Sequence, residues 1–139
     1  MKRIVLGLSL ILLLTTPVWA VEANDVKVEV LAKSSASWDG SHLPEEYLPG
    51  PPEVTILRIK IPPGAQLPLH QHPEINAGVL LTGELTVITE DHHTLHLKPG
   101  EAIVEVVDKW HYGKNEGHET AEIIVFYAGI VNKPITIKK

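Results

Sequence analysis

The chain has 139 residues, a formal net charge of −5 at neutral pH and no cysteine. The acidic balance argues against binding to nucleic acid, which usually requires a basic patch, and against binding to anionic membrane surfaces. Without cysteine there are no disulfides, and any metal site must be built from histidine and oxygen ligands. The length suits one domain with a single core.

Residues 1–20 have the pattern of a secretory signal peptide. Lys2 and Arg3 form a positive start, residues 4–14 form an apolar run, and Ala20 is a small residue suited to cleavage. The alternative is an uncleaved anchor, but this run is short against the roughly 20 residues that a membrane-spanning helix needs. We expect a mature chain of 119 residues with a net charge of −7, periplasmic or secreted and without a membrane span.

The rest of the chain has the short alternating runs of an all-β protein. In chain order, we expect strands at residues 26–30, 54–61, 84–90, 94–97, 101–107 and 120–128. Turn residues separate these runs, as in Pro62-Pro63-Gly64 and Lys98-Pro99-Gly100, which is typical of a sandwich or barrel. We divide the chain into a signal peptide (1–20), an N-terminal strand with a proline-rich loop (21–52) and a barrel (53–139).

The proline-rich segment, residues 34–52, contains four prolines and no alternation. Loops of this length are uncommon in compact domains and are often functional or disordered. Trp38, Leu43 and Tyr47 make the segment too apolar for a plain linker. We interpret it as a loop that lies over the barrel, where it either closes one mouth or only covers an apolar edge.

A His-x-His pair, His70 and His72, lies in a stretch framed by Gly64 and Gly83, and His111 follows 39 residues after His72. Residues two apart on an extended chain face the same way, so the pair can direct both imidazoles into one space. A third imidazole from another strand would complete a site for a transition metal with an open position.

The chain resembles the cupin superfamily in two motifs. The first motif is matched at four positions, Gly64, His70, His72 and Gly83. The second motif is matched at three positions, Gly100, His111 and Asn115, while Val106 and Asp108 replace a proline and a glycine of the motif. The resemblance implies a single-domain jelly-roll barrel, the double-stranded β-helix, with a divalent transition metal (Fe, Mn, Zn or Ni) inside one mouth.

The first motif departs from the family at the position of its metal-binding glutamate, which here is Asn76; Glu74 stands two residues too early. The family includes three-histidine sites, as in thiol dioxygenases, so the resemblance still implies a metal at His70, His72 and His111. Asn76 is either a weak fourth ligand or an amide that hydrogen-bonds a metal-bound water or a neighbouring histidine.

The other histidines, His92, His93, His96 and His118, are expected at the surface, and no general base is evident beside the predicted metal. Our first hypothesis is a metal-dependent enzyme, oxygenase-like or an isomerase, acting on a small organic molecule. The alternative is a non-catalytic module that holds a metal or small ligand for sensing, storage or delivery. An open sheet edge needs covering, which makes a homodimer the default expectation.

Overall fold

The computed structural model describes residues 27–47 and 49–139. The predicted signal peptide, residues 21–26 and Leu48 lie outside these ranges. No helix in the described ranges is long and apolar enough to cross a membrane. Within them the chain forms strands β1 (Pro52–Ile61), β2 (His70–Gln71), β3 (Asn76–Thr82), β4 (Leu85–Thr89), β5 (Thr94–Leu97), β6 (Ala102–Val104), β7 (His111–Lys114), β8 (Ala121–Ile130) and β9 (Ile137–Lys138).

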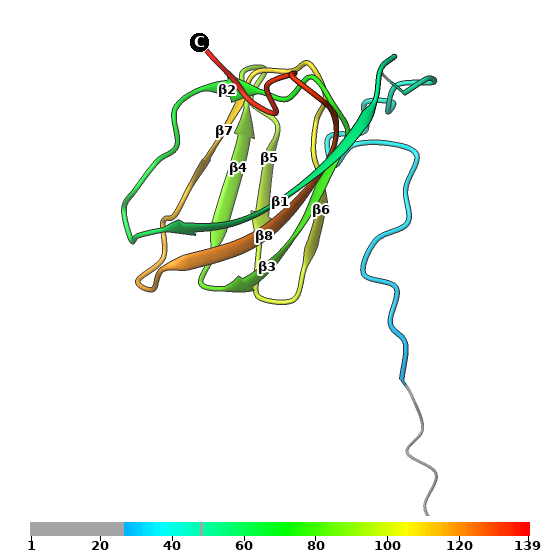
Figure 1. The fold of residues 1–139 in the computed structure, drawn as a ribbon. Helices are drawn as coiled ribbons and strands as arrows, with labels where there is room; N and C mark the ends of the chain where they lie inside the picture. The colour runs from blue at the N-terminus through cyan, green and yellow to red at the C-terminus, as the bar shows by residue number, and fades with distance from the viewer. Residues whose placement is uncertain (1–26, 48) are drawn as a thin grey trace, which may run out of the picture.

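The strands form two antiparallel sheets that enclose a barrel (Figure 1). One sheet has the order β1-β8-β3-β6 and the other has the order β5-β4-β7-β2-β9. Neighbouring strands are often far apart in sequence, as in β1 and β8, which pair along ten residues. The expected all-β, single-domain jelly-roll barrel is confirmed.

The core follows from the alternation of β1 and β8. In β1, Leu57, Ile59 and Ile61 face the interior, while Arg58 faces outward and pairs with Glu122 of β8. The buried residues of both sheets, Leu80, Leu85, Val87 and Ile103 among them, form one cluster. The apolar interior therefore fills most of the barrel.

The backbone conformation at two turns explains which residue types stand at two motif positions, 83 and 108. Gly83 has a φ of +70°, and a Cβ there would lie 2.7 Å from the Thr120 carbonyl oxygen, so only glycine fits. Asp108, at the second motif's glycine position, has a φ of +53°. Aspartate tolerates this left-handed conformation better than most residues. Its N–H donates to the His72 carbonyl (2.8 Å), which ties the two motifs together.

The N-terminal strand is not formed in its described part. Residues 27–33 have no strand pairing, and Val28 and Val30 are 85% and 72% exposed. Alternation of valines suits a strand, but a strand also needs a neighbouring edge with which to pair. In Figure 1 this segment runs away from the barrel.

The proline-rich loop covers the edge of β6. The backbone N–H of Trp38 donates to the Val104 carbonyl (2.9 Å), and the Ser37 hydroxyl donates to the Glu105 carbonyl (2.8 Å). The Trp38 side chain packs against the core, whereas Tyr47 is 77% exposed. The contacts of residues 37 and 38 fit the second alternative for the loop, the covering of an edge.

Several elements differ from the sequence prediction. Strand β6 is shorter than the expected 101–107, because a turn intervenes before His111. The sequence gives no separate signal for β2 and β9, which have two residues each. Strand β9 pairs with β2, so the C-terminal segment lies beside the histidine pair at one end of the barrel (Figure 1).

Candidate metal centre

Strands β2 and β7 bring the three predicted histidines together. His70 lies in β2, His72 follows it on the same side, and antiparallel pairing places His111 of β7 directly opposite His70. The centroids of the rings are 4.5 Å apart for His70 and His111, 4.9 Å for His70 and His72 and 5.1 Å for His72 and His111. The three rings therefore share one space, as the spacing in the sequence predicts.

Backbone carbonyls fix the orientation of each ring. The Nδ1 of His70 donates to Pro68 O (2.7 Å), that of His72 to Ile135 O (2.7 Å), and that of His111 to Lys109 O (2.9 Å). A carbonyl oxygen can only accept, so Nδ1 carries the proton in each ring. In the neutral tautomer the Nε2 atoms are left with free lone pairs, which is how proteins prepare histidine for a metal.

The geometry and charge of these rings fit a metal ion. One nitrogen from each ring lies within 4.8 Å of the others. Two zinc–nitrogen bonds of about 2.0–2.1 Å span at most about 4.2 Å, so only small ring movements are needed. Burial lowers the pKa of all three histidines, to about 4 for His72. The rings therefore stay neutral at physiological pH, as a metal ligand must.

Asn76 lies in β3 and lines the same cavity as the three histidines. It is 1% exposed, its Nδ2 makes a long hydrogen bond to Glu74 O (3.4 Å), and its Oδ1 has no partner in the described residues. A buried amide oxygen without a partner is unusual. The position suits either predicted role of Asn76, as a weak ligand or as an acceptor for a bound water, and both stay predictions.

Glu105 is the site residue that the sequence analysis missed. Its side chain is 13% exposed, and its Oε2 lies 3.7 Å from His111 Nε2. Burial raises the pKa of Glu105 to about 7, while His70 and the Trp38 indole act in the opposite direction. Trp38 Nε1 nevertheless has no hydrogen-bond partner among the described residues. A signal was available, because residue 105 is in phase with the buried Ile103.

The polar groups stand at one end of a small cavity of about 50 Å³. Because a cavity needs about 10–15 Å³ to hold one water, this space has room for a metal ion with a few small ligands. The other walls are apolar and include Ile59, Val87, Val125 and Tyr127. Trp110 and Tyr112 do not line the cavity; the aromatic residue that does so is Tyr127, 5.3 Å from the His72 ring.

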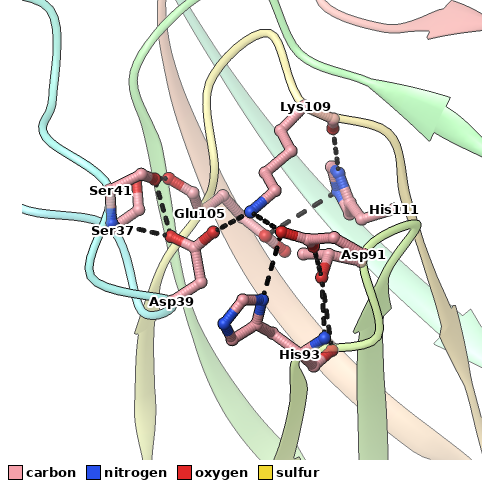
Figure 2. A network of polar contacts seen from close by, with 9 residues as sticks. Ser37, Asp39, Ser41, Asp91, His93, Glu105, Lys109 and His111 are labelled. Atoms are coloured by element: carbon pink, nitrogen blue, oxygen red, sulfur yellow. Dashed lines mark hydrogen bonds and ion pairs between the residues drawn. The ribbon is translucent and has the colours of Figure 1, made fainter.

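A second polar cluster, the Lys109 network, lies beside this end of the barrel (Figure 2). Lys109 Nζ contacts Asp39 Oδ2 (2.5 Å) and Asp91 Oδ2 (2.8 Å), and His93 Nδ1 lies 3.2 Å from Asp91. Burial raises the pKa of Asp39, but hydrogen bonds from Lys109 and Ser41 outweigh it and lower the pKa overall. The network joins the N-terminal loop to the β4–β5 hairpin.

The remaining candidates lie away from the centre. His92, His93, His96 and His118 are exposed, as expected. Glu74 is 2% exposed, and neither carboxylate oxygen has a partner in the described part of the chain. Its side chain lies against Gly129 and does not line the histidine cavity, and burial raises its pKa.

Comparison with solved structures gives the fold. The DMSP lyase DddQ from Ruegeria pomeroyi DSS-3 is 21% identical with a TM-score of 0.55, over 62% of this chain and 43% of the lyase. An oxalate oxidase in complex with the substrate analogue glycolate is 25% identical with a TM-score of 0.53, over 61% of this chain and 45% of the oxidase. The chain thus matches less than half of the length of either enzyme.

A cupin-like protein from Thermotoga maritima MSB8 is 16% identical with a TM-score of 0.56, over 62% of this chain and 64% of that protein. No match was found among curated proteins. The sequence matches the Cupin domain family over residues 57–127, just over half of its length. This match spans β1 to β8 and includes all three histidines. The chain therefore belongs to the cupin family.

Proposed function

We propose that the protein is an exported, metal-dependent enzyme that acts on a small organic molecule at His70, His72 and His111. Export is supported by the signal-peptide pattern of residues 1–20, which indicates the periplasm or the extracellular space. The reaction class that we favour is oxygen-dependent, and the similarity to an oxalate oxidase supports it. A small carboxylic acid is then the first substrate class to test.

The observation that carries the proposal is the shared tautomer of the three rings. Each Nδ1 donates to a backbone carbonyl, so three Nε2 lone pairs converge without a proton of their own. A structural histidine in a core usually satisfies both ring nitrogens, because an unpaired buried polar atom is costly. His111 Nε2 has no such partner in the described ranges.

The residues of the chain would divide the work as follows. The three rings, oriented by backbone carbonyls, would hold the ion, and the apolar walls of the barrel would exclude bulk water from it. A bound divalent metal would supply Lewis acidity and open coordination positions. A substrate has to fit the small cavity, which favours molecules of few atoms.

Metal content and oxygen uptake test the proposal. Protein purified from the periplasm of the producing cell should carry one transition metal per chain, which His70→Ala should lose. His118→Ala is the matched control, because His118 is exposed in a turn. The metal-loaded protein should consume oxygen with at least one of a panel of small carboxylic acids that includes oxalate and glycolate. Wild-type protein that binds no metal would refute the proposal.

The second candidate is a non-catalytic module that holds a metal or small ligand. The size of the cavity, about 50 Å³, favours it, because an organic substrate has little room beside the ion. Tight metal binding with no oxygen consumption, and no turnover in a screen of small acids for decarboxylation, lyase or isomerase products, would support this candidate.

A further inference from the structure

Asn76 and Glu105 occupy neighbouring positions on two paired strands. Strands β3 and β6 are antiparallel, with Ala77 opposite Val104, and the Glu105 N–H donates to the Asn76 carbonyl (3.0 Å). Continuing this register places residue 105 directly opposite residue 76. Opposite residues on antiparallel strands direct their side chains to the same face. Both side chains line the histidine cavity.

The side chains of Glu105 and His111 face each other without forming a hydrogen bond. Both Glu105 Oε2 and His111 Nε2 carry lone pairs in the neutral-ring tautomer, and they face each other at 3.7 Å (Figure 2). This distance is too long for a hydrogen bond, which spans about 2.7–3.2 Å. Neither atom has another hydrogen-bond partner among the described residues. Two facing lone pairs in a buried site repel unless a proton, a metal cation or a bound water lies between them.

The charge of the cavity points to the same conclusion. Three neutral imidazoles and one neutral amide would leave the full double charge of a divalent ion inside an apolar barrel, which is unfavourable. Among the described residues that line the cavity, Glu105 alone has a carboxylate, and no lysine or arginine lines it. Its backbone is held on both sides, by the Asn76 carbonyl and by the Ser37 hydroxyl.

We propose that Glu105 supplies the negative charge of the metal centre, taking over from the neighbouring strand the role of a carboxylate at position 76. A carboxylate at position 105 in place of one at position 76 explains how a site with an amide at position 76 can still accommodate a divalent cation. It rests on the proposed metal site at His70, His72 and His111. It goes beyond that proposal by assigning the anionic group of the site to a residue that neither sequence motif specifies.

Titration of the metal-free protein with Co²⁺, followed by visible absorption at fixed pH, tests the assignment. Glu105→Gln should weaken Co²⁺ binding about tenfold or more, the scale seen when groups around a metal are removed. Glu53→Gln is the matched control, because Glu53 is an exposed carboxylate on β1, and it should leave affinity unchanged. A loss of less than tenfold in Glu105→Gln would overturn the proposal.

A double-mutant cycle separates charge from structure. Adding Asn76→Glu to Glu105→Gln should restore most of the lost affinity, because the carboxylate returns at the opposite position. Adding Asn76→Glu alone to the wild type should give a smaller gain, since the charge is already present. A double variant no tighter than Glu105→Gln would overturn the proposal, as would an equal gain in both backgrounds.

Two controls keep the outcome readable. Circular dichroism and melting of each variant establish that it is folded, and glutamine preserves the shape of glutamate. If Glu105→Gln does not fold, the Co²⁺ affinity of the single variant Asn76→Glu decides the question. A gain of tenfold or more in its affinity over the wild type would contradict the proposal. If His70→Ala and His111→Ala leave metal stoichiometry unchanged, the proposed function fails; if they abolish binding but Glu105→Gln does not weaken it, only this assignment fails.

Discussion

Two polar regions, the Lys109 network and the histidine cavity, meet at the segment that carries Lys109 and His111. They differ in whether their polar atoms have hydrogen-bond partners. In the Lys109 network, the ammonium group contacts two carboxylates, and Asp39 also accepts hydrogen bonds from Ser41. In the histidine cavity, polar atoms of Asn76, Glu105 and His111 have no partner in the described residues.

The difference assigns a structural role to the Lys109 network and a binding role to the histidine cavity, although the two regions are only a few residues apart. A network whose members satisfy one another stabilises the fold and needs no further group. A set of buried acceptors directed at one point is unfavourable by itself and becomes favourable when a cation is bound. Lys109 belongs to both regions, because its side chain holds the network and its carbonyl orients the His111 ring.

The largest expected effect is the loss of the metal from His111→Ala. This change removes one of three nitrogens and leaves two, so affinity for Co²⁺ should fall at least about 100-fold. The measurement is the absorption titration described above, with His118→Ala as the control for an exposed histidine. Unchanged affinity would show that the three rings are a structural cluster.

Neutralising Glu105 should stabilise the metal-free protein. The pKa of Glu105 is about 7 in the folded protein against 4.5 ordinarily, so the unfolded chain ionises first as pH rises. The folded carboxylate therefore opposes folding from pH 4.5 upward, with the full effect above pH 7. At about 1.4 kcal/mol per pKa unit, Glu105→Gln should add up to about 3 kcal/mol to the free energy of unfolding at pH 8.

Urea unfolding of the wild type and Glu105→Gln at pH 4 and pH 8, without metal, measures this gain. The two proteins should have nearly equal stability at pH 4. A variant less stable than the wild type at pH 8 would contradict the picture of a buried carboxylate without partners.

Lys109→Met should lower the free energy of unfolding by about 2 kcal/mol, because it leaves the Asp39 carboxylate buried without its cationic partner. The Asp39 side chain is 1% exposed. Lys114→Met is the matched control, since both lysine side chains are 29% exposed but Glu116, the partner of Lys114, is 53% exposed. We expect the control to change stability by no more than about 0.5 kcal/mol.

The pH dependence of this loss has a definite direction. The pKa of Asp39 is lowered in the folded protein, so the stability it contributes is present above its ordinary pKa of 3.8 and is lost as pH falls below it. The difference between Lys109→Met and the wild type should therefore shrink in urea unfolding at pH 3. An undiminished difference at pH 3 would contradict the role of the ion pair.

The smallest expected effect is that of Lys109→Met on metal affinity. The residue orients His111 through its backbone carbonyl, which the substitution keeps. Affinity for Co²⁺ should therefore stay within about threefold of the wild type, as for independent sites. A larger loss would show that the network and the centre act as one unit.

The sequence predicted the barrel and the histidine cluster because both depend on local spacing. Alternation identified β1, β4, β5 and β8 to within a few residues, and the His-x-His spacing placed two rings on one face. The glycine at position 83 was informative for the same reason, since its backbone conformation excludes a side chain.

The rest of the site depends on contacts between distant segments, which spacing alone does not reveal. Glu105 is directed at the cavity by the pairing of β6 with β3, and Ile135 O orients His72 from the C-terminal segment. A backbone carbonyl has no sequence signal of its own. The N-terminal alternation at residues 26–30 failed for the converse reason, because in its described part the pattern has no strand with which to pair.

The central claim is that one metal ion binds between the three imidazoles beside Glu105. Crystals of the metal-loaded protein, measured at the absorption edge of the metal, test it most directly. We predict one anomalous peak bonded to Nε2 of His70, His72 and His111, at about 2.0–2.2 Å, with the Glu105 carboxylate bound to the ion or to one of its waters. A peak elsewhere, or one bonded through Nδ1, would contradict the account.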